Sequence, residues 1–279
     1  MSRIEFSYRS EALGYRTTFS AIMPSIDWLD MMRGGSADDF RGRKYPVLWL
    51  LHGTSGDNEC WLRFTRIESW AEQHRIAVIM PDCRLSAYCD MNPGPAFYTY
   101  LTDELPRVCQ AIFPIHADRE NTFIGGLSMG GYGALKIGLR NPDKYAAILN
   151  LSGGVDRVAH VRRAIDEDRQ TGLHNLSAMR TTFGDLDDIE GSVNDVFALA
   201  KRLSDEDGEK PDIYTSIGVD DPHWDENIRL RKLLIEEGYE LFWEQGPYIH
   251  DWECWNHYIE SGMGWLSKRA SKTPEVRSW

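Results

Sequence analysis

The fold of this 279-residue chain is decided by residues 121–133, which read Asn-Thr-Phe-Ile-Gly-Gly-Leu-Ser-Met-Gly-Gly-Tyr-Gly. A short apolar run ends at two glycines, Ser128 follows, and a stretch rich in helix formers continues to Arg140, where Asn-Pro stops it. This order predicts a strand, a sharp turn and a helix. Gly126 and Gly130 leave room for a strained turn that lifts the serine hydroxyl above the end of the strand. The pattern therefore predicts a nucleophile elbow.

The helix expected after Ser128 supplies what a nucleophilic serine needs. Its first backbone N–H groups have no intrahelical partner, and its N-terminus is the positive end of the helix dipole. We therefore expect the N–H of Met129 to donate to an oxyanion beside Ser128. A Gly-x-Ser-x-Gly pattern also arises by chance in glycine-rich turns, but such a turn has no reason to lie between an apolar strand and a helix.

The composition narrows the class of protein. A formal net charge of −12 argues against nucleic acid or an anionic membrane surface as the main partner, because either would favour a basic face. Residues 1–16 lack the apolar core of a secretory signal and no stretch approaches transmembrane length, so we expect a cytoplasmic protein. The five cysteines match no zinc spacing and are expected to be buried, reduced thiols. The sequence is compatible with a homo-oligomer but does not define one.

Apolar runs that alternate with helical patterns indicate an α/β fold with a mostly parallel central sheet and helices on both faces. The runs expected to be parallel strands are 47–51, 76–80, 123–124 before the two glycines of the elbow, 145–151, 213–218 and 239–243. Residues 4–8 and 15–23 alternate polar and apolar side chains, which predicts an antiparallel pair at the sheet edge. We expect a single domain over residues 1–279, with a helical insertion at about 155–208 that is either a lid or pocket wall or a solvated decoration.

A glycine-containing loop follows the predicted strand 47–51 directly. Such a loop at the carboxyl end of a central strand is where an open α/β sheet places its site. Its backbone at Gly53, Thr54 and Ser55 is expected to offer the second N–H donor of an oxyanion hole. The alternative is a plain turn in which His52 has a structural role.

Two further loops supply groups that would activate Ser128. Asp221 follows the predicted strand 213–218, and His250 follows the next strand. A serine hydroxyl is a weak nucleophile at neutral pH unless a base accepts its proton and a third group orients that base. Because parallel strands end at the same sheet edge, the three side chains are expected to meet there. Their order along the chain is typical of α/β-hydrolases.

Both assignments have rivals in the neighbouring sequence. Asp220 directly precedes Asp221, and the pattern alone leaves both open. His257 and His223 compete with His250, but His257 is expected in the last helix and His223 lies beside the acid. Asp220, Asp221 and His223 could in principle bind a metal. Acidic loops often carry such clusters without one, so we expect neither a catalytic metal nor a cofactor.

Several segments carry a family resemblance that spans nearly the whole chain. They are Tyr45-Pro-Val-Leu-Trp-Leu-Leu-His-Gly, Val78-Ile-Met-Pro-Asp, Tyr98-Thr-Tyr-Leu-Thr-Asp-Glu-Leu-Pro, Gly126-Leu-Ser-Met-Gly-Gly-Tyr-Gly-Ala-Leu, Phe183-Gly-Asp-Leu and His250-Asp-Trp. Together they resemble the esterase D-type putative esterase family, and most closely its tributyrin esterase branch. The resemblance implies an α/β-hydrolase fold and a catalytic triad of Ser128, Asp221 and His250, which favours Asp221 over Asp220.

The activity that this resemblance implies is that of a serine carboxylesterase acting on a small-molecule, short-chain acyl ester. Related branches keep four alternatives open, namely feruloyl esterase, acetyl-carbohydrate esterase, S-formylglutathione hydrolase and acyltransferase. S-formylglutathione hydrolases usually have histidine before the nucleophile, whereas this chain has Leu127, which weighs against that thioester. Close relatives commonly reach the catalytic histidine through Gly-Gly-His, and here the chain reads Pro247-Tyr-Ile-His.

Polar and aromatic side chains near the predicted loops are candidates for binding the substrate. They are Ser55, Trp61, Tyr88, Trp224 and Tyr248. Aromatic side chains can equally belong to the core of an α/β fold, and the sequence does not separate the two roles. Residues 83–97 are expected to form a loop along one wall of the pocket.

Overall fold

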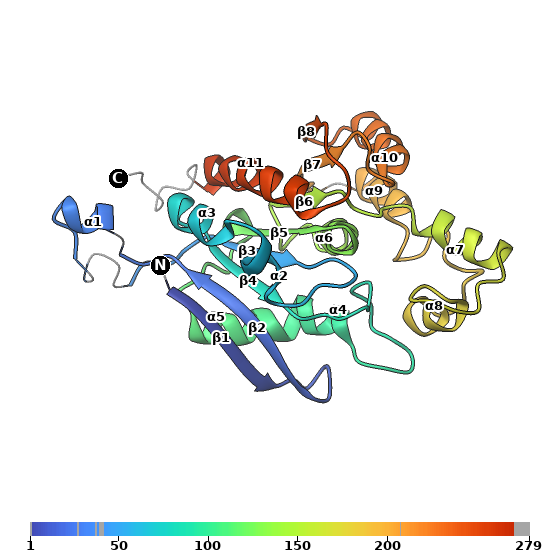
Figure 1. Cartoon of the computed structure of the whole chain (residues 1–279), viewed down its shortest axis with the longest axis horizontal. Coiled ribbons are helices and arrows are strands. Elements are labelled where there is room, and N and C mark those ends of the chain that lie inside the picture. The colour runs from blue at the N-terminus through green and yellow to red at the C-terminus, as the bar shows by residue number, and fades with distance from the viewer. Residues whose placement is uncertain (1, 27, 37, 39–41, 207, 271–279) are drawn as a thin grey trace.

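The computed structural model describes residues 2–26, 28–36, 38, 42–206 and 208–270 (Figure 1). Eight strands form one sheet in the order β1-β2-β4-β3-β5-β6-β7-β8. They are β1 (Ser2–Arg9), β2 (Arg16–Met23), β3 (Val47–Leu51), β4 (Ala77–Pro81), β5 (Thr122–Leu127), β6 (Ala147–Leu151), β7 (Asp212–Gly218) and β8 (Leu241–Gly246). β2 pairs antiparallel with β1 and β4, and the other pairs are parallel, which confirms the α/β-hydrolase sheet expected from the sequence.

The burial of each strand reflects whether helices cover one face or both faces of the sheet at that position. β3, β4, β5 and β6 are buried along their whole length, as expected of strands with helices on both faces. β1 at the edge alternates exposed and half-buried side chains. Gly126 at the end of β5 lies opposite Leu51 at the end of β3, so the two strands reach the same sheet edge together.

Helices cover both faces of the sheet. The longer helices are α3 (Ile67–His74), α5 (Leu105–Ile112), α6 (Met129–Arg140), α7 (Arg157–Asp166), α8 (Leu176–Phe183), α9 (Val196–Ser204), α10 (Trp224–Glu236) and α11 (Trp252–Ala270). One apolar core includes residues of α5, α6, α9 and α10, and a second core on the other face includes residues of α3 and α11. The short elements are α1 (Trp28–Met32), α2 (Cys60–Phe64), α4 (Phe97–Thr99), η2 (Tyr100–Glu104) and η3 (Arg119–Asn121).

One local feature differs from the sequence pattern, and a second is caused by a proline. Residues 27–44 read as a loop, but their described part contains the short helix α1; residues 27, 37 and 39–41 lie outside the described part. Pro106 cannot donate to the carbonyl of Thr102, and the helix adopts a π turn over Tyr100–Glu104 before α5 continues. The Thr102 carbonyl accepts a hydrogen bond from Lys144 Nζ at 3.1 Å instead.

The segment between β6 and β7 carries α7, α8 and α9, in the region where an insertion was expected. In Figure 1, α7 and α8 lie at the right-hand end of the molecule, beyond the sheet. They enclose a small apolar core of their own, made of Val161, Ala164, Leu176, Met179, Leu186 and Ile189. Of the residues described, none belongs to a helix with the length and hydropathy needed to cross a bilayer.

The elbow is held by close backbone packing that only glycine allows. A Cβ on Gly126 would lie 2.6 Å from the carbonyl of Gly130 and 2.8 Å from the Leu51 oxygen. A Cβ on Gly130 would lie 2.5 Å from the Leu51 oxygen and 2.7 Å from the His52 oxygen. These are backbone atoms that no rotamer change can move, so the start of α6 lies directly against the end of β3.

We expect Gly130→Ala to lower the free energy of unfolding by about 3 kcal/mol, because the added methyl group must push α6 away from the end of β3. Gly264→Ala is the matched control. Gly264 is also helical, but a Cβ there would lie 3.8 Å from its nearest non-local atom, so alanine should be neutral or stabilise by up to about 1 kcal/mol. Urea unfolding measures both variants, and a loss below about 1 kcal/mol for Gly130→Ala would contradict the packing argument.

Candidate active site

Ser128 occupies the turn between β5 and α6 in a strained backbone conformation. Its φ is 54° and its ψ is −116°, values that a residue with a side chain rarely adopts and that cost on the order of 1–3 kcal/mol. The Ser128 N–H donates to the Leu151 carbonyl at 2.9 Å, and its carbonyl accepts from Tyr132 at 3.1 Å. These bonds hold the turn, and the side chain is left at the sheet edge.

The structure brings the three predicted side chains together. His250 Nε2 lies 3.0 Å from Ser128 Oγ, and His250 Nδ1 lies 2.8 Å from Asp221 Oδ2. The Asp221 side chain is fully buried, and its other oxygen accepts the backbone N–H of His223 at 2.8 Å. Because that carboxylate is acceptor-only when ionised, Nδ1 of His250 carries the proton, and Nε2 is free to accept one from the serine.

The rival residues lie elsewhere. Asp220 is exposed, and its backbone N–H donates to the Tyr248 carbonyl at 3.2 Å. His257 lies in α11, where its ring stacks on Tyr248 with centroids 5.2 Å apart. The His223 ring lies 5.0 Å from that of His250 but is hydrogen-bonded to Glu226. Of the alternatives left open by the sequence, the geometry favours Asp221 and His250.

The loop after β3 lies beside the serine. A Cβ built on Gly53 would be 3.5 Å from Ser128 Cβ, so the backbone of Gly53 is next to the nucleophile. His52 is buried, and its Nε2 accepts the Cys83 N–H at 2.9 Å while Nδ1 donates to the Gly53 carbonyl at 2.6 Å. Burial lowers the pKa of His52 and favours this neutral form. His52 therefore has the structural role that the sequence left as an alternative.

Trp61 and Tyr88 are both completely buried. Trp61 Nε1 donates to the Leu51 carbonyl at 3.1 Å, and the Tyr88 hydroxyl donates to the His52 carbonyl at 2.5 Å. The two rings thus hold the backbone that leads into the glycine loop. Because they fill the core beneath the loop, their burial disfavours the prediction that they bind substrate.

The other predicted binding residues lie at different places around the site. Ser55 is exposed on the glycine loop. The Trp224 ring packs edge-on against Trp243 of β8 at 6.3 Å, and Tyr248 packs against His257 and Tyr258 of α11. None of these side chains lines the pocket beside the elbow.

That pocket, of about 270 Å³, opens between the elbow and the helical insertion. Leu85, Ala87 and Met91 form one wall, as expected for the loop after β4, and Met129 brings the first turn of α6 to it. The opposite wall comes from α7, α8 and the segment between them, and it includes Arg157, His160, Val161, His174, Met179 and Phe183. The insertion therefore borders the pocket in this structure.

A buried cation fixes the loop wall of the pocket. Lys136 of α6 is completely buried, and its Nζ donates to the Ala87 carbonyl at 2.8 Å, to Cys89 Sγ at 3.0 Å and to Asn194 Oδ1 at 3.3 Å. All three ammonium protons thus have partners, although burial lowers the pKa of the group. The loop, the elbow helix and the end of the insertion are joined at this point.

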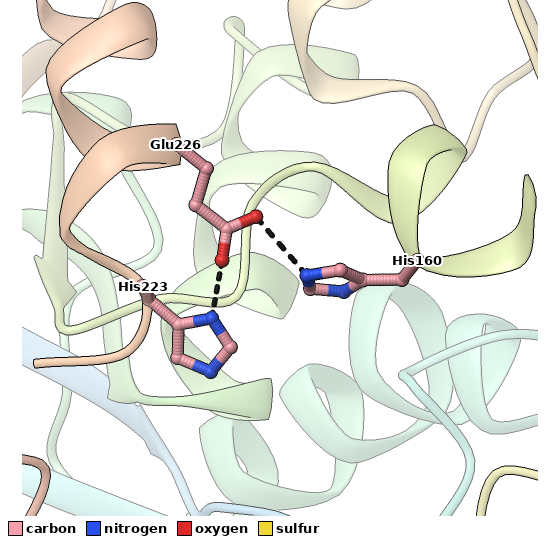
Figure 2. Close-up of side chains that lie close together, drawn as sticks. All are labelled: His160, His223 and Glu226. Carbon is pink, nitrogen blue, oxygen red and sulfur yellow. Dashed lines mark hydrogen bonds and ion pairs between the residues drawn. The ribbon is translucent and has the colours of Figure 1, made fainter. Parts of the chain in front are cut away.

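Figure 2 shows a second polar cluster beside the triad, in which the Glu226 carboxylate lies between the rings of His160 and His223. His223 Nδ1 is hydrogen-bonded to Oε1, and His160 Nε2 lies 3.3 Å from Oε2. Oε2 also accepts the backbone N–H of Asp156 at 2.8 Å. Burial by itself raises the pKa of the Glu226 carboxyl, but the hydrogen bonds and charges of both histidines outweigh it and hold the pKa well below its usual value.

This cluster was not predicted from the sequence. His223 and Glu226 are three residues apart at the start of α10, which is a visible signal, but His160 comes from α7 and its contact depends on how the insertion folds back. The three side chains have the donor types of a metal site. The carboxylate is nevertheless already satisfied by three donors, and the Arg157 guanidinium lies 3.4 Å from His160, which disfavours a divalent cation.

Comparisons with known proteins agree with this geometry. Residues 38–265 match the family described as Putative esterase. An acetyl esterase from Caldicellulosiruptor saccharolyticus is 34% identical over 269 residues, which are 96% of this chain and 99% of the relative. Two solved structures from Staphylococcus aureus, the fluorophosphonate-binding serine hydrolase FphF and the S-formylglutathione hydrolase FrmB, superpose with TM-scores of 0.82 and 0.79. Each is 28% identical, and each match covers 95% of this chain and 98% of the other.

We expect Glu226→Gln to destabilise the protein by about 1–3 kcal/mol at pH 7, because an amide has one acceptor oxygen where three donors converge. The folded-state pKa is lowered, so the carboxylate contributes fully above its unfolded value of about 4.3 and loses that contribution as the pH falls toward the folded value. The difference in unfolding free energy between wild type and variant should therefore shrink below about pH 4. A difference that stays constant from pH 7 to pH 3 in urea unfolding would contradict the assigned charge.

Proposed function

The chain belongs to the Putative esterase family, and we propose that it is a serine carboxylesterase that hydrolyses short-chain acyl esters through an acyl-enzyme. The observation that carries this proposal is the chain of hydrogen bonds from Ser128 Oγ through His250 to Asp221, with distances of 3.0 and 2.8 Å. Nucleophile, base and orienting acid are thus within reach of one another before substrate binds.

In the proposed reaction, His250 Nε2 accepts the Ser128 proton as Oγ attacks the ester carbonyl carbon. The tetrahedral intermediate collapses, the alcohol leaves with the proton returned by His250, and the acyl group stays on Oγ. Water then attacks the acyl-enzyme by the same route, and the carboxylic acid is released. Asp221 keeps the imidazole in the required tautomer and stabilises it while it is charged.

The oxyanion of each intermediate would lie between two backbone donors. The Met129 N–H is at the first position of α6, where no intrahelical partner exists and the helix dipole is positive. The second donor would come from the backbone of the loop of Gly53, Thr54 and Ser55, in which Gly53 lies beside Ser128. Donors fixed in this way need no reorganisation as charge develops.

A short acyl group fits the pocket beside Met129, whose volume is about 270 Å³ and whose lining is mostly apolar. The relative named acetyl esterase, which spans nearly the whole chain, supports this size class. The structural neighbour named S-formylglutathione hydrolase supports thioester cleavage as a second activity, which would proceed through the same acyl-enzyme.

The proposed location is the cytoplasm. All five cysteines are buried and unpaired, which suits a reducing compartment. Burial raises the pKa of the Cys60 and Cys254 thiols to about 12, so neither is suited to be a nucleophile.

We expect Ser128→Ala to lower kcat/KM for 4-nitrophenyl acetate and butyrate at least about a thousandfold, because no other group can form the acyl-enzyme. Initial rates on the acetate, butyrate and octanoate esters measure this loss of kcat/KM and show which acyl length the pocket accepts. Circular dichroism checks that the variant is folded. A fluorophosphonate probe should label wild type and not the variant. Residual activity within about tenfold of wild type would remove Ser128 from the role of nucleophile.

Asp221→Asn should lower kcat roughly a thousandfold or more, because an amide facing His250 can donate to Nδ1 and stabilise the wrong tautomer. Asp220→Asn is the matched control next to it. Since the Asp220 side chain is exposed, the kcat of the Asp220→Asn variant should stay within about twofold of wild type. The reverse ranking in steady-state kinetics would move the acid to Asp220.

A further inference from the structure

The pocket between the elbow and the insertion has a charge pattern that simple ester hydrolysis does not need. Its lining contains one arginine and two histidines, and it contains no aspartate or glutamate, although the chain as a whole has a net charge of −12. The basic members are Arg157, His160 and His174, all from the insertion. The remaining lining residues are apolar apart from Thr181 and Thr182. A neutral acyl group would have no use for a charged side chain here.

Arg157 is the charged member of this lining. It is the first residue of α7, and its guanidinium lies over the Tyr132 ring, with Cζ 4.5 Å from the centroid. Tyr132 is on the first turn of α6, the helix that begins directly after Ser128. Its Nε is buried without a hydrogen-bond partner, and among the described residues no ion pair at 4.0 Å or less includes Arg157.

The nearby carboxylate does not neutralise this guanidinium by direct contact. Both oxygens of Glu226 are occupied by His160, His223 and the Asp156 N–H. His160 cannot neutralise the guanidinium either, because an imidazole ring carries no negative charge; its Nδ1 lies 3.4 Å from Arg157 Nη1. Among the described residues, the guanidinium therefore has an unused Nε–H donor and no direct ion pair at the wall of this pocket.

We propose that Arg157 binds a carboxylate on the substrate, so that the preferred esters are those that carry a negatively charged group within a few carbon–carbon bonds of the scissile carbonyl. This inference rests on the proposed esterase function and names its substrate class. A guanidinium in apolar surroundings pairs strongly with one carboxylate through two parallel hydrogen bonds. A phosphate dianion fits less well, because a single arginine would leave one of its charges buried without compensation.

The carboxylate has two possible sources, the acyl group and the alcohol, and matched substrate pairs separate them. Mono-4-nitrophenyl adipate against its methyl ester tests a carboxylate on the acyl group, with 4-nitrophenol release as the readout. 4-Acetoxybenzoate against methyl 4-acetoxybenzoate tests one on the alcohol, with release of the phenol as the readout. Within each pair the size is nearly constant and the charge differs. Wild type should show a kcat/KM at least about tenfold higher for the charged member of one pair.

The variant that tests the residue is Arg157→Met, which removes the charge and retains an apolar chain. It should raise KM for the preferred carboxylate ester roughly tenfold to a hundredfold, with KM for the uncharged partner within about threefold of wild type. Arg157→Lys, which keeps the charge and loses the two-pronged geometry, should retain part of the preference. Arg163→Met, an exposed arginine on the same helix, is the control and should change neither value.

The possible outcomes separate this inference from the proposed function. Equal kcat/KM within both pairs for wild type, with 4-nitrophenyl acetate still cleaved, overturns the carboxylate subsite and leaves the esterase intact. Failure to cleave any ester overturns the proposed function itself. If Arg157→Met does not fold, the wild-type preference and its weakening by added salt still test the charge requirement. A preference that survives in folded Arg157→Met would assign the charge to another residue.

Discussion

The site depends on one close approach, that of the first turn of α6 to the carboxyl end of β3. Gly130 lies against the Leu51 and His52 carbonyls, and the same two carbonyls accept hydrogen bonds from buried Trp61 and Tyr88. The packing forces Ser128 into its strained turn and places the glycine loop beside it. Nucleophile and oxyanion loop are therefore fixed by one contact between neighbouring strands, and the energy of that turn is offset by core burial on both faces of the sheet.

Much of this could be predicted from the sequence, because parallel strands carry their loops to a common edge. Ser128, Asp221 and His250 each follow an apolar run, and chain order alone places them at that edge. The choice between Asp221 and Asp220 could not be made in this way, since adjacent side chains in a turn point in different directions. Only the loop conformation shows that Asp221 is buried against His250 and that Asp220 faces solvent.

Tertiary contacts account for what the sequence did not predict. An aromatic ring near a loop can fill the core or line a pocket with the same residue type, and Trp61 and Tyr88 belong to the core. The cluster of His160, Glu226 and His223 requires α7 to fold back on α10, a contact that no local periodicity encodes. Arg157 was missed for the same reason, because its environment is created by the insertion.

The separate apolar core of α7 and α8 has an evolutionary consequence. Apolar side chains of α7, α8 and the segment after them pack together in this core, so substitutions of the apolar pocket residues on these helices mainly alter the stability of the insertion itself. The sheet edge that holds the triad is stabilised by other contacts, so such substitutions would change the geometry of the triad little. Substrate range in such a protein can drift by mutation of the insertion while the hydrolytic machinery stays under selection, so that lineages sharing one chemistry can come to consume different esters.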